Sequence, residues 1–317
     1  MLRFIANRGL QSIIVLFLVT VIVFALMRIL PGDPVAIIAG TGVEGLTAEE
    51  EAQLRARFGL DQPLPMQYIN WIGNVLVGDW GTSTRTGAPV WSELTHRAPI
   101  TAQLALTAWA IAVLVGVTTG VAAAIHRRTP IDSFSTAFAM FGISMPDFWL
   151  GILLILVFSV WMGLLPSVGF VSPATDLLLN LKHLLLPALA LGLSEAAVFM
   201  RQTRSGMLEV LGQDFIRVAR AKGTPERVII WHHTLKNAAL PIVTIMGLRF
   251  GRLIGGTVVI ESIFGLPGLG RLAVQSIVMR DYLALQGVVL LVALFVVIIN
   301  LITDIIYAVL DPRIRLA

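Results

Sequence analysis

The chain has 317 residues, of which 56% are hydrophobic and only 13% are charged, with a formal net charge of +4. Soluble globular proteins carry about 25% charged and about 45–50% apolar residues, so this composition excludes a soluble domain and places the chain in a membrane. The absence of cysteine excludes disulfides, thiolate metal sites and thiol nucleophiles, and a chain with three lysines has no polybasic tract for nucleic acid.

Six apolar segments are long enough to cross a bilayer as helices, which takes about 20 residues. They cover residues 9–27, 99–125, 134–165, 184–200, 238–260 and 283–301. The third segment is interrupted by Pro146 and Asp147. The first segment is too long for the apolar core of a signal peptide and has no small-residue cleavage site, so we expect a retained anchor. The pattern predicts an all-α membrane protein with six transmembrane helices.

Basic residues predict which side of the membrane each connection faces. They cluster before the first span, after the second, between the fourth and fifth, and at the end of the chain. By the positive-inside rule, these clusters and both termini are cytoplasmic. The expected parts are residues 1–30 with the first transmembrane helix, an extracytoplasmic loop with short helices over 31–98, a five-helix core over 99–310 and a cytoplasmic tail over 311–317. The core contains a cytoplasmic loop over residues 201–237.

The extracytoplasmic loop carries signals for short helices. Thr47 and Glu50 form a capping box, and Gly59 would close the helix that they open. Residues 68–76 have apolar side chains at helical spacing, and residues 78–83 predict a turn. The loop is either a small cap packed on the helix bundle or a docking surface for an extracytoplasmic partner, and the sequence favours neither.

The cytoplasmic loop predicts two short helices joined by a sharp turn. The first helix is expected over residues 209–222. One of its stripes comprises Phe215, Val218, Ala219 and Lys222. Gly223 is suited to the left-handed position that ends a helix. Thr224 is expected to cap the second helix, with Pro225 as its first residue, and this helix extends to Asn237.

Three interpretations of this helix–glycine–helix element compete. A DNA-binding helix-turn-helix is disfavoured, because the element is tethered between two spans and lacks a three-helix core. An amphipathic stretch in the lipid interface is compatible with the sequence. A rigid knob that fits a cleft on a cytoplasmic partner best explains why so compact a turn joins two membrane helices.

The stretch of residues 213–223, followed by Leu240-Pro241, resembles the coupling-helix loop of ABC-transporter permeases. More narrowly, the chain is similar to the dipeptide/oligopeptide/nickel permease family, in the subunit with a large extracytoplasmic loop after the first transmembrane helix. Further matching motifs lie at residues 30–34, 58–64, 78–83, 148–151, 267–271, 280–282 and 310–313. The chain departs from the general motif at Arg217-Val218 and in the longer gap between Gly223 and Leu240, as is usual in the peptide branch.

This resemblance implies a permease subunit with the type I ABC importer fold, which moves di- or oligopeptides or a related small solute across the bacterial cytoplasmic membrane by alternating access. The implied partners are a homologous second permease subunit, two ABC ATPase subunits and an extracytoplasmic solute-binding protein, in addition to membrane lipid. The implied ATPase-coupling residues are Phe215, Arg217, Val218, Ala219, Ala221 and Gly223. Because the chain has no G-x-x-x-x-G-K-[ST] motif, ATP and Mg²⁺ are expected in the partner ATPase subunits, and no cofactor, metal or catalytic residue is expected here.

Five charged residues fall inside or at the ends of the apolar segments. They are Asp147, Glu195, Arg249, Arg252 and Asp304. Each costs about 2.5–3.5 kcal/mol at the centre of an inserted helix, so each should face the bundle interior, a partner or water. The first four either form a substrate pathway, with arginines for a peptide carboxylate and a carboxylate for its amino terminus, or only pair to hold helices together. Asp304 is expected to be structural, and glycines at 247, 251, 255 and 256 predict a close helix contact.

Two other classes of function compete with a permease subunit. An intramembrane protease or transferase lacks support, because there is no H-E-x-x-H motif and no complete nucleophile elbow, and the adjacent His232 and His233 point to different helix faces. An ion-coupled secondary transporter is the stronger alternative, since mid-membrane charges suit ion coupling. Six spans are few for such a transporter unless the chain dimerises, and the cytoplasmic knob would have no purpose. The solute stays open among dipeptides, longer peptides, glutathione, nickel complexes and opine-like compounds.

Overall fold

The structure is a computed structural model that describes residues 2–29, 49, 53, 56 and 61–310. The predicted capping box at Thr47 and Glu50 and the helix end at Gly59 lie outside these residues. Within them the chain is helical, and its β pairing is limited to one isolated antiparallel bridge between Thr82 and Pro89. The predicted all-α class is therefore confirmed.

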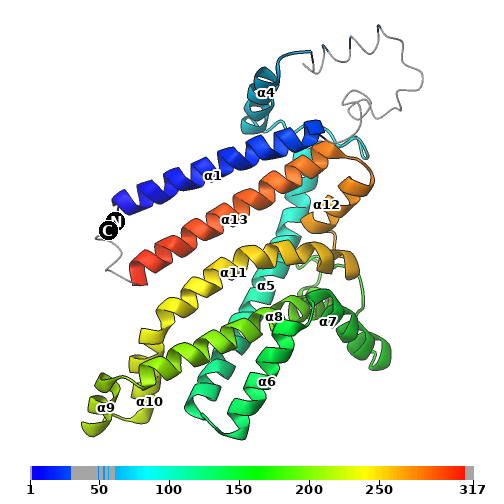
Figure 1. Ribbon diagram of the computed structural model, residues 1–317. Helices are drawn as coiled ribbons and strands as arrows, with labels where there is room; N and C mark the ends of the chain where they lie inside the picture. Colours follow the sequence, from blue (N-terminus) through cyan, green and yellow to red (C-terminus); the bar gives the residue numbers. More distant parts are fainter. Residues whose placement is uncertain (1, 30–48, 50–52, 54–55, 57–60, 311–317) are drawn as a thin grey trace. The chain divides into compact units, whose positions relative to one another are not determined.

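Among the described residues, five helices are long and apolar enough to cross a membrane. They are α1 (Leu2–Ile29), α5 (Val90–Ile125), α8 (Leu177–Leu211), α11 (Leu235–Ile263) with the short helical segments before it, and α13 (Tyr282–Leu310) (Figure 1). Each contains one of the predicted apolar segments. The 36 residues of α5 and the 35 of α8 span about 50 Å at the helical rise, so both helices extend beyond a hydrocarbon core about 30 Å thick.

The third predicted span is not one straight helix. α6 (Pro130–Ser144) stops at the central proline, and α7 (Asp147–Leu154) leaves at an angle of 107° and continues into the π-helical segment η1 (Ile155–Trp161). Pro146 has an extended backbone with φ −66° and ψ 135°, and Met145 before it is also extended. Proline disfavours helical conformation in the residue before it and donates no N–H, which explains the break. The pair is a sixth span only if both halves are counted together.

The chain forms two compact units. The first comprises Met1–Arg8, Ala102–Leu266 and Ile298–Ala317, and the second comprises Gly9–Thr101 and Pro267–Val297. In the first unit, α6, α7 and α11 all pack on α8. The most apolar window of α8 is accordingly 72% buried, whereas that of α1 is 6% buried. Because α8 is buried on most sides, it forms the core of this unit.

Glycines allow the backbones of α5 and α8 to come into direct contact. A Cβ added to Gly116 would lie 2.7 Å from the carbonyl oxygen of Ala196, and a Cβ on Gly120 would lie 2.7 Å from that of Met200. Gly192 on α8 faces α5 in the same way. In lipid, small residues at a helix contact maximise dispersion attraction between helices. The G-x-x-x-G spacing of Gly116 and Gly120 is the sequence signal for this contact, which was not among the predicted helix contacts.

The glycines predicted to make a close contact on α11 do so only in part. A Cβ on Gly247 would collide with the side chain of Thr303 on α13, so these two helices do approach closely there. A Cβ on Gly255 would meet no atom within 4 Å. A Cβ on Gly256 would lie 3.2 Å from Cδ2 of Leu191 on α8, so the stripe makes close contacts at Gly247 and Gly256, with two different helices.

The second unit is organised around the start of α13. Its core is built from α5, α12 (Leu269–Val278) and α13, and its buried members are Val90, Leu94, Leu269, Leu272, Ala284, Val288 and Leu291. Ser83, at the end of the predicted turn, donates a hydrogen bond to the buried carboxylate of Asp281. Asp281 also accepts a bond from the N–H of Ala284 at 3.2 Å and so caps α13. The turn is thereby tied to the beginning of a long helix.

The amphipathic stretch of the outer loop forms α4 (Leu64–Leu76). The Tyr68 ring lies 5.5 Å from that of Phe24 on α1, and the Tyr68 hydroxyl is 2.7 Å from the hydroxyl of Thr20. These contacts support the interpretation of α4 as a cap packed on a membrane helix. The far end of α4 stays exposed, with Leu76 80% accessible.

An ion pair holds the beginning of α6 on α8. Arg204 donates from Nε to Oδ1 of Asp132 at 2.6 Å and from Nη2 to Oδ2 at 3.0 Å. Oδ2 also accepts the backbone N–H of Arg128, whose φ of +66° marks a tight turn between α5 and α6. The single buried carboxylate of Asp132 thus fixes both the turn and the helix contact.

We expect Asp132→Ala to destabilise the folded chain by about 1–3 kcal/mol, because the bidentate bond and the turn bond are lost together. The melting temperature of the purified chain in detergent, followed by intrinsic fluorescence, measures this. Glu209→Ala, at an exposed position on α8, is the matched control and should melt like the unmodified chain. Equal melting temperatures for both variants would show that the ion pair contributes nothing.

Candidate functional site

Two sites emerge in the first unit, and the first is the helix–turn–helix element between α8 and α11. It consists of α9 (Asp214–Ala221), a turn, and α10 (Glu226–Val228), which continues through the π-helical η2 (Ile229–Thr234) into α11. Figure 1 shows α9 and α10 together at one end of α8 and α11. The predicted single helix over residues 209–222 is wrong, because α8 ends at Leu211 and Gln213 is extended at ψ 152° before α9 starts.

The turn after α9 is a Schellman motif centred on Gly223. The N–H of Gly223 donates to the carbonyl of Arg220 at 3.0 Å, and the N–H of Thr224 donates to that of Ala219 at 3.1 Å. Gly223 has φ +78°, the left-handed region that favours glycine, as predicted. The prediction that Thr224 caps the next helix is wrong, because its N–H closes the previous one. Pro225 is itself the capping residue, and no side chain bonds to this helix end.

Polar and apolar contacts keep the two arms of the element in place. Arg220 on α9 donates to both carboxylate oxygens of Glu226 on α10, at 2.6 and 3.3 Å, across the turn. This hydrogen bond raises the pKa of the Arg220 guanidinium above its usual value. Ile216 and Ile229 are fully buried and belong to a cluster that includes Met207 of α8. The element is therefore anchored by one isoleucine in each arm, and neither isoleucine is among the predicted coupling residues.

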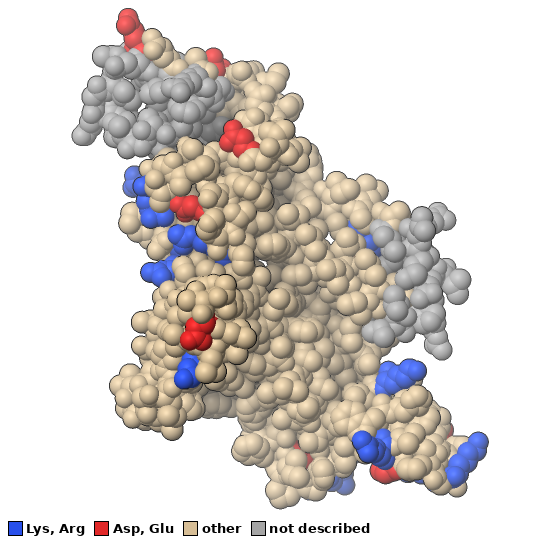
Figure 2. All heavy atoms as spheres, turned by 180° about the vertical axis from the view of Figure 1, so that it is seen from behind, with Lys and Arg blue, Asp and Glu red and all other residues tan. Residues whose placement is uncertain are grey.

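The outer surface of this element contains the predicted coupling residues. Arg217, Ala221 and Gly223 are exposed, Ala219 is half-buried, and the apolar side chains of Phe215 and Val218 are 42% and 52% exposed. Basic side chains gather over α9 and α10 (Figure 2), and those described as exposed are Arg217, Arg220, Lys222 and Arg227. Exposed apolar side chains among charged ones are typical of a protein-docking surface.

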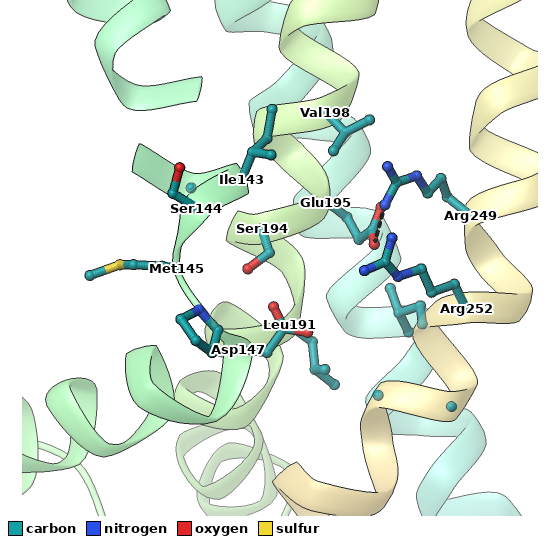
Figure 3. A pocket seen from close by; sticks show the side chains of 15 residues that line it. Ile143, Ser144, Met145, Asp147, Leu191, Ser194, Glu195, Val198, Arg249 and Arg252 are labelled. Atoms are coloured by element: carbon teal, nitrogen blue, oxygen red, sulfur yellow. Dashed lines mark hydrogen bonds and ion pairs between the residues drawn. The ribbon is translucent and has the colours of Figure 1, made fainter. Parts of the chain in front are cut away.

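The second site is a cavity of about 660 Å³ between α8, α11 and the break in the third span. All four residues predicted for a substrate pathway line it, which sequence alone could not establish. Figure 3 shows Arg249 and Arg252 entering from α11, Glu195 from α8, and Asp147 from the start of α7. The cavity is therefore lined by two acidic and two basic side chains from three helical segments.

These charges lie deep within the apolar helices. Glu195 is the 19th of the 35 residues of α8, and Arg249 is the 15th of the 29 residues of α11. Arg249 Nη1 is 3.4 Å from Oε1 of Glu195, a long contact that joins the two helices. Asp147 and Arg252 form no ion pair with any described residue. The interpretation that these charges only pair to hold helices together thus accounts for Arg249 and Glu195. It does not explain Asp147 and Arg252.

Asp304 does not reach this cavity. Its carboxylate forms an ion pair with Arg8 of α1, at 3.4 Å between Nε and Oδ2. Both side chains are partly exposed, so the pair contributes little energy. This geometry agrees with the structural role expected from the sequence.

Comparison with known proteins places the chain in a family. Residues 116–316 match the family described as "Binding-protein-dependent transport system inner membrane component". Residues 1–105 match its companion, "Binding-prot-dependent transport system membrane comp, N-term". Together the two regions include nearly the whole chain, and both the α9–α10 element and the charged cavity lie within the first of them.

Several relatives align over the full length. The dipeptide transport system permease protein DppB of Escherichia coli is 42% identical over 99% of both chains. A putative peptide transport system permease protein of Brucella abortus is 43% identical, and the glutathione transport system permease protein GsiC of Salmonella typhimurium is 44% identical, each over 99% of both chains.

A solved structure shares the fold. An inward-facing conformation of the MetNI methionine ABC transporter aligns with a TM-score of 0.56, covers 69% of this chain and 96% of that chain, and is 18% identical. The predicted ABC importer permease fold is thereby confirmed. With matching family models over both halves and relatives above 40% identity, the chain belongs to the inner membrane components of binding-protein-dependent transport systems, as a multi-pass permease of the ABC importer class.

Proposed function

We propose that this chain is the permease subunit of an ATP-driven importer that moves peptides, or a related small solute, across the inner membrane by alternating access. The names of relatives that transport dipeptides and glutathione support this solute class. The observation that carries the mechanism is the α9–α10 element. Its helix α9 lies outside the helices that are long and apolar enough to cross a membrane, presents Phe215 and Val218 to the outside, and is anchored to the core by Ile216. A rigid, exposed knob suits a permease that is moved by another protein.

The partners follow from this proposal. Two ABC ATPase subunits would hold ATP and Mg²⁺, one of them gripping α9 through Phe215, Arg217, Val218, Ala219, Ala221 and Gly223. A homologous second permease would complete the membrane part, and an extracytoplasmic binding protein would deliver the solute. In this arrangement residues 201–237 and both termini are cytoplasmic, and residues 31–98 are outside, as the distribution of basic residues supports.

The charged cavity would form part of the solute pathway. Arg249, Arg252, Asp147 and Glu195 line it at the depth where alternating access places a solute between two gates. A charged residue in the membrane is costly unless it has a partner or water, and two of these four have no ionic partner among the described residues. A pathway that receives polar solutes gives those two residues a function.

Site-directed crosslinking tests the docking of α9. Because the native chain has no cysteine, Phe215→Cys and Val218→Cys each introduce a unique thiol. In membranes of the native host, we expect both variants to crosslink to an ATP-hydrolysing subunit. Ile13→Cys on α1, which is 65% exposed, is the control and should give no such product. An α9 that reacts only with water-soluble reagents, without a nucleotide-hydrolysing neighbour, would refute the coupling role.

Energy coupling separates the proposal from ion-coupled transport. The purified chain alone, in proteoliposomes with an imposed proton or sodium gradient, should not accumulate dialanine. In cells, uptake that depends on this chain should stop when ATP is depleted at a maintained membrane potential. Accumulation by the isolated chain under a gradient would instead identify a secondary transporter.

A further inference from the structure

The charged cavity contains hydrogen-bonding groups that the protein itself does not use. Oε1 of Glu195 contacts Arg249, but Oε2 is buried and has no hydrogen-bond partner among the described residues. The hydroxyl oxygen of Ser194, the next residue on α8, is also buried without a partner. Glu195 is only 8% exposed, and both residues line the cavity. Buried acceptors without a partner are rare in native proteins, and each one calls for an explanation.

Two other segments that line the cavity, α7 and α11, each contribute one further charged side chain. Asp147 stands at the start of α7, and Arg252 stands on α11 (Figure 3). Neither forms an ion pair within the part of the chain that the structure describes. Together with Oε2 of Glu195, the cavity thus offers two carboxylates, one from α7 and one from α8, and from α11 a guanidinium that forms no ion pair with a described residue.

The break in the third span creates the room for this arrangement. Met145 and Pro146, which interrupt the helix, belong to the cavity wall. Non-helical backbone at membrane depth is tolerated where it lines a polar cavity, and discontinuous helices often form solute sites in transporters. The volume of about 660 Å³ lies within the range of about 300–1,000 Å³ that is usual for small-molecule sites.

We propose that this cavity binds a zwitterionic solute and selects for a free amino group and a free carboxylate at the same time. The amino group would donate to Oε2 of Glu195, to the hydroxyl of Ser194 and to Asp147. The carboxylate would accept from the guanidinium of Arg252. Arg249 is a positioning residue that orients Glu195.

The charge balance of the cavity supports this solute class. Two acids face two arginines, so a solute without net charge leaves the cavity neutral, whereas a dianion or a dication leaves charge uncompensated in a medium of low dielectric constant. The inference rests on the proposed transport function and adds to it. It gives the permease a selectivity of its own, in addition to any selectivity of the binding protein.

The test measures binding of dialanine to the full chain in nanodiscs by equilibrium dialysis. N-acetyl-dialanine lacks the amino charge, and dialanine amide lacks the carboxylate. We expect dialanine to bind at least about tenfold more tightly than either derivative, because each lost charge removes charge-assisted hydrogen bonds. Failure of dialanine to bind, or equal binding of all three compounds, would overturn the proposal.

Variants assign each preference to its residue. Glu195→Gln should remove the preference for a free amino group and retain the preference for a carboxylate, and Arg252→Gln should do the reverse. Glu209→Gln and Arg201→Gln, at exposed positions on α8 outside this cavity, should retain both preferences. A residue that only holds helices together would weaken binding of all three compounds equally, and that outcome would also contradict the proposal.

Two further variants allow the amino-group preference to be tested even if one of the first variants misfolds. If Glu195→Gln does not fold, because Arg249 loses its partner, Ser194→Ala and Asp147→Asn should each reduce the amino preference on their own. Unchanged preferences in both would overturn the amino site. Import of dialanine by cells is scored separately: import without any selectivity in the cavity refutes this inference alone, whereas absence of ATP-dependent import refutes the proposed function.

Discussion

Gly223→Asp is expected to abolish ATP-coupled transport while leaving the chain folded and inserted in the membrane. A Cβ at this position would meet no atom of the chain within 4 Å, so the substitution does not disturb internal packing. The left-handed φ of +78° costs a non-glycine residue about 1 kcal/mol, and the new carboxylate lies at the C-terminal end of α9, where the helix dipole disfavours negative charge. The change therefore acts mainly on the surface that α9 presents to a partner.

The measurement compares substrate-stimulated ATP hydrolysis and uptake in membranes that contain equal amounts of each variant. Gly212→Ala at the other end of α9 is the matched control, because Gly212 has φ −80° and any residue adopts that conformation. It should retain most of the activity. Normal stimulation of hydrolysis in Gly223→Asp would mean that the turn does not couple ATP hydrolysis to transport. If the variant fails to insert into the membrane, Gly223 is required for folding instead.

Gly120→Leu is expected to disrupt the helix bundle, with a loss of stability above about 3 kcal/mol. Its Cβ would lie 2.7 Å from both the carbonyl oxygen of Met200 and the Cβ of Thr203, so α5 and α8 would have to separate. Because α8 also carries Glu195, the cavity should lose its geometry at the same time. Melting temperature and yield of folded protein in detergent report the loss.

Gly9→Ala provides the comparison for this substitution. Gly9 is also within a membrane helix, α1, but a Cβ there would meet nothing within 4 Å. Its melting temperature should equal or slightly exceed that of the unmodified chain, since alanine favours helix over glycine by about 1 kcal/mol. If Gly120→Leu melts at the same temperature as Gly9→Ala, the contact between α5 and α8 is not a determinant of the fold.

The two candidate sites are connected through the same two helices. α8 carries Glu195 and leads into α9, while α11 carries Arg249 and follows directly from η2. From Glu195 to the end of α8 at Leu211 the helix extends about 24 Å at the standard rise. Under the proposed function, a movement of α9 and α10 would therefore displace α8 and α11 and act on the long contact between Glu195 and Arg249. The position of the knob and the geometry of the cavity would change together.

The class of the protein follows from its amino-acid sequence alone. Apolar segments of about 20 residues have few alternatives to helices in lipid, since every backbone hydrogen bond must be made internally. It also located the glycine turn, because a left-handed residue at a helix end has a strong preference for glycine. The outward-facing residues of α9 were recognised by resemblance, and their exposure agrees with that reading.

The contacts between distant segments could not be predicted without the three-dimensional structure. The sequence placed Asp147, Glu195, Arg249 and Arg252 in three separate spans, and it left open whether they pair or share a cavity. The structure shows a pair between two of them and a cavity lined by all four, because the bend at Pro146 turns α7 away from α6. A single sequence indicates that a proline can break a helix. The direction of the chain after the break depends on the space that α8 and α11 leave for packing.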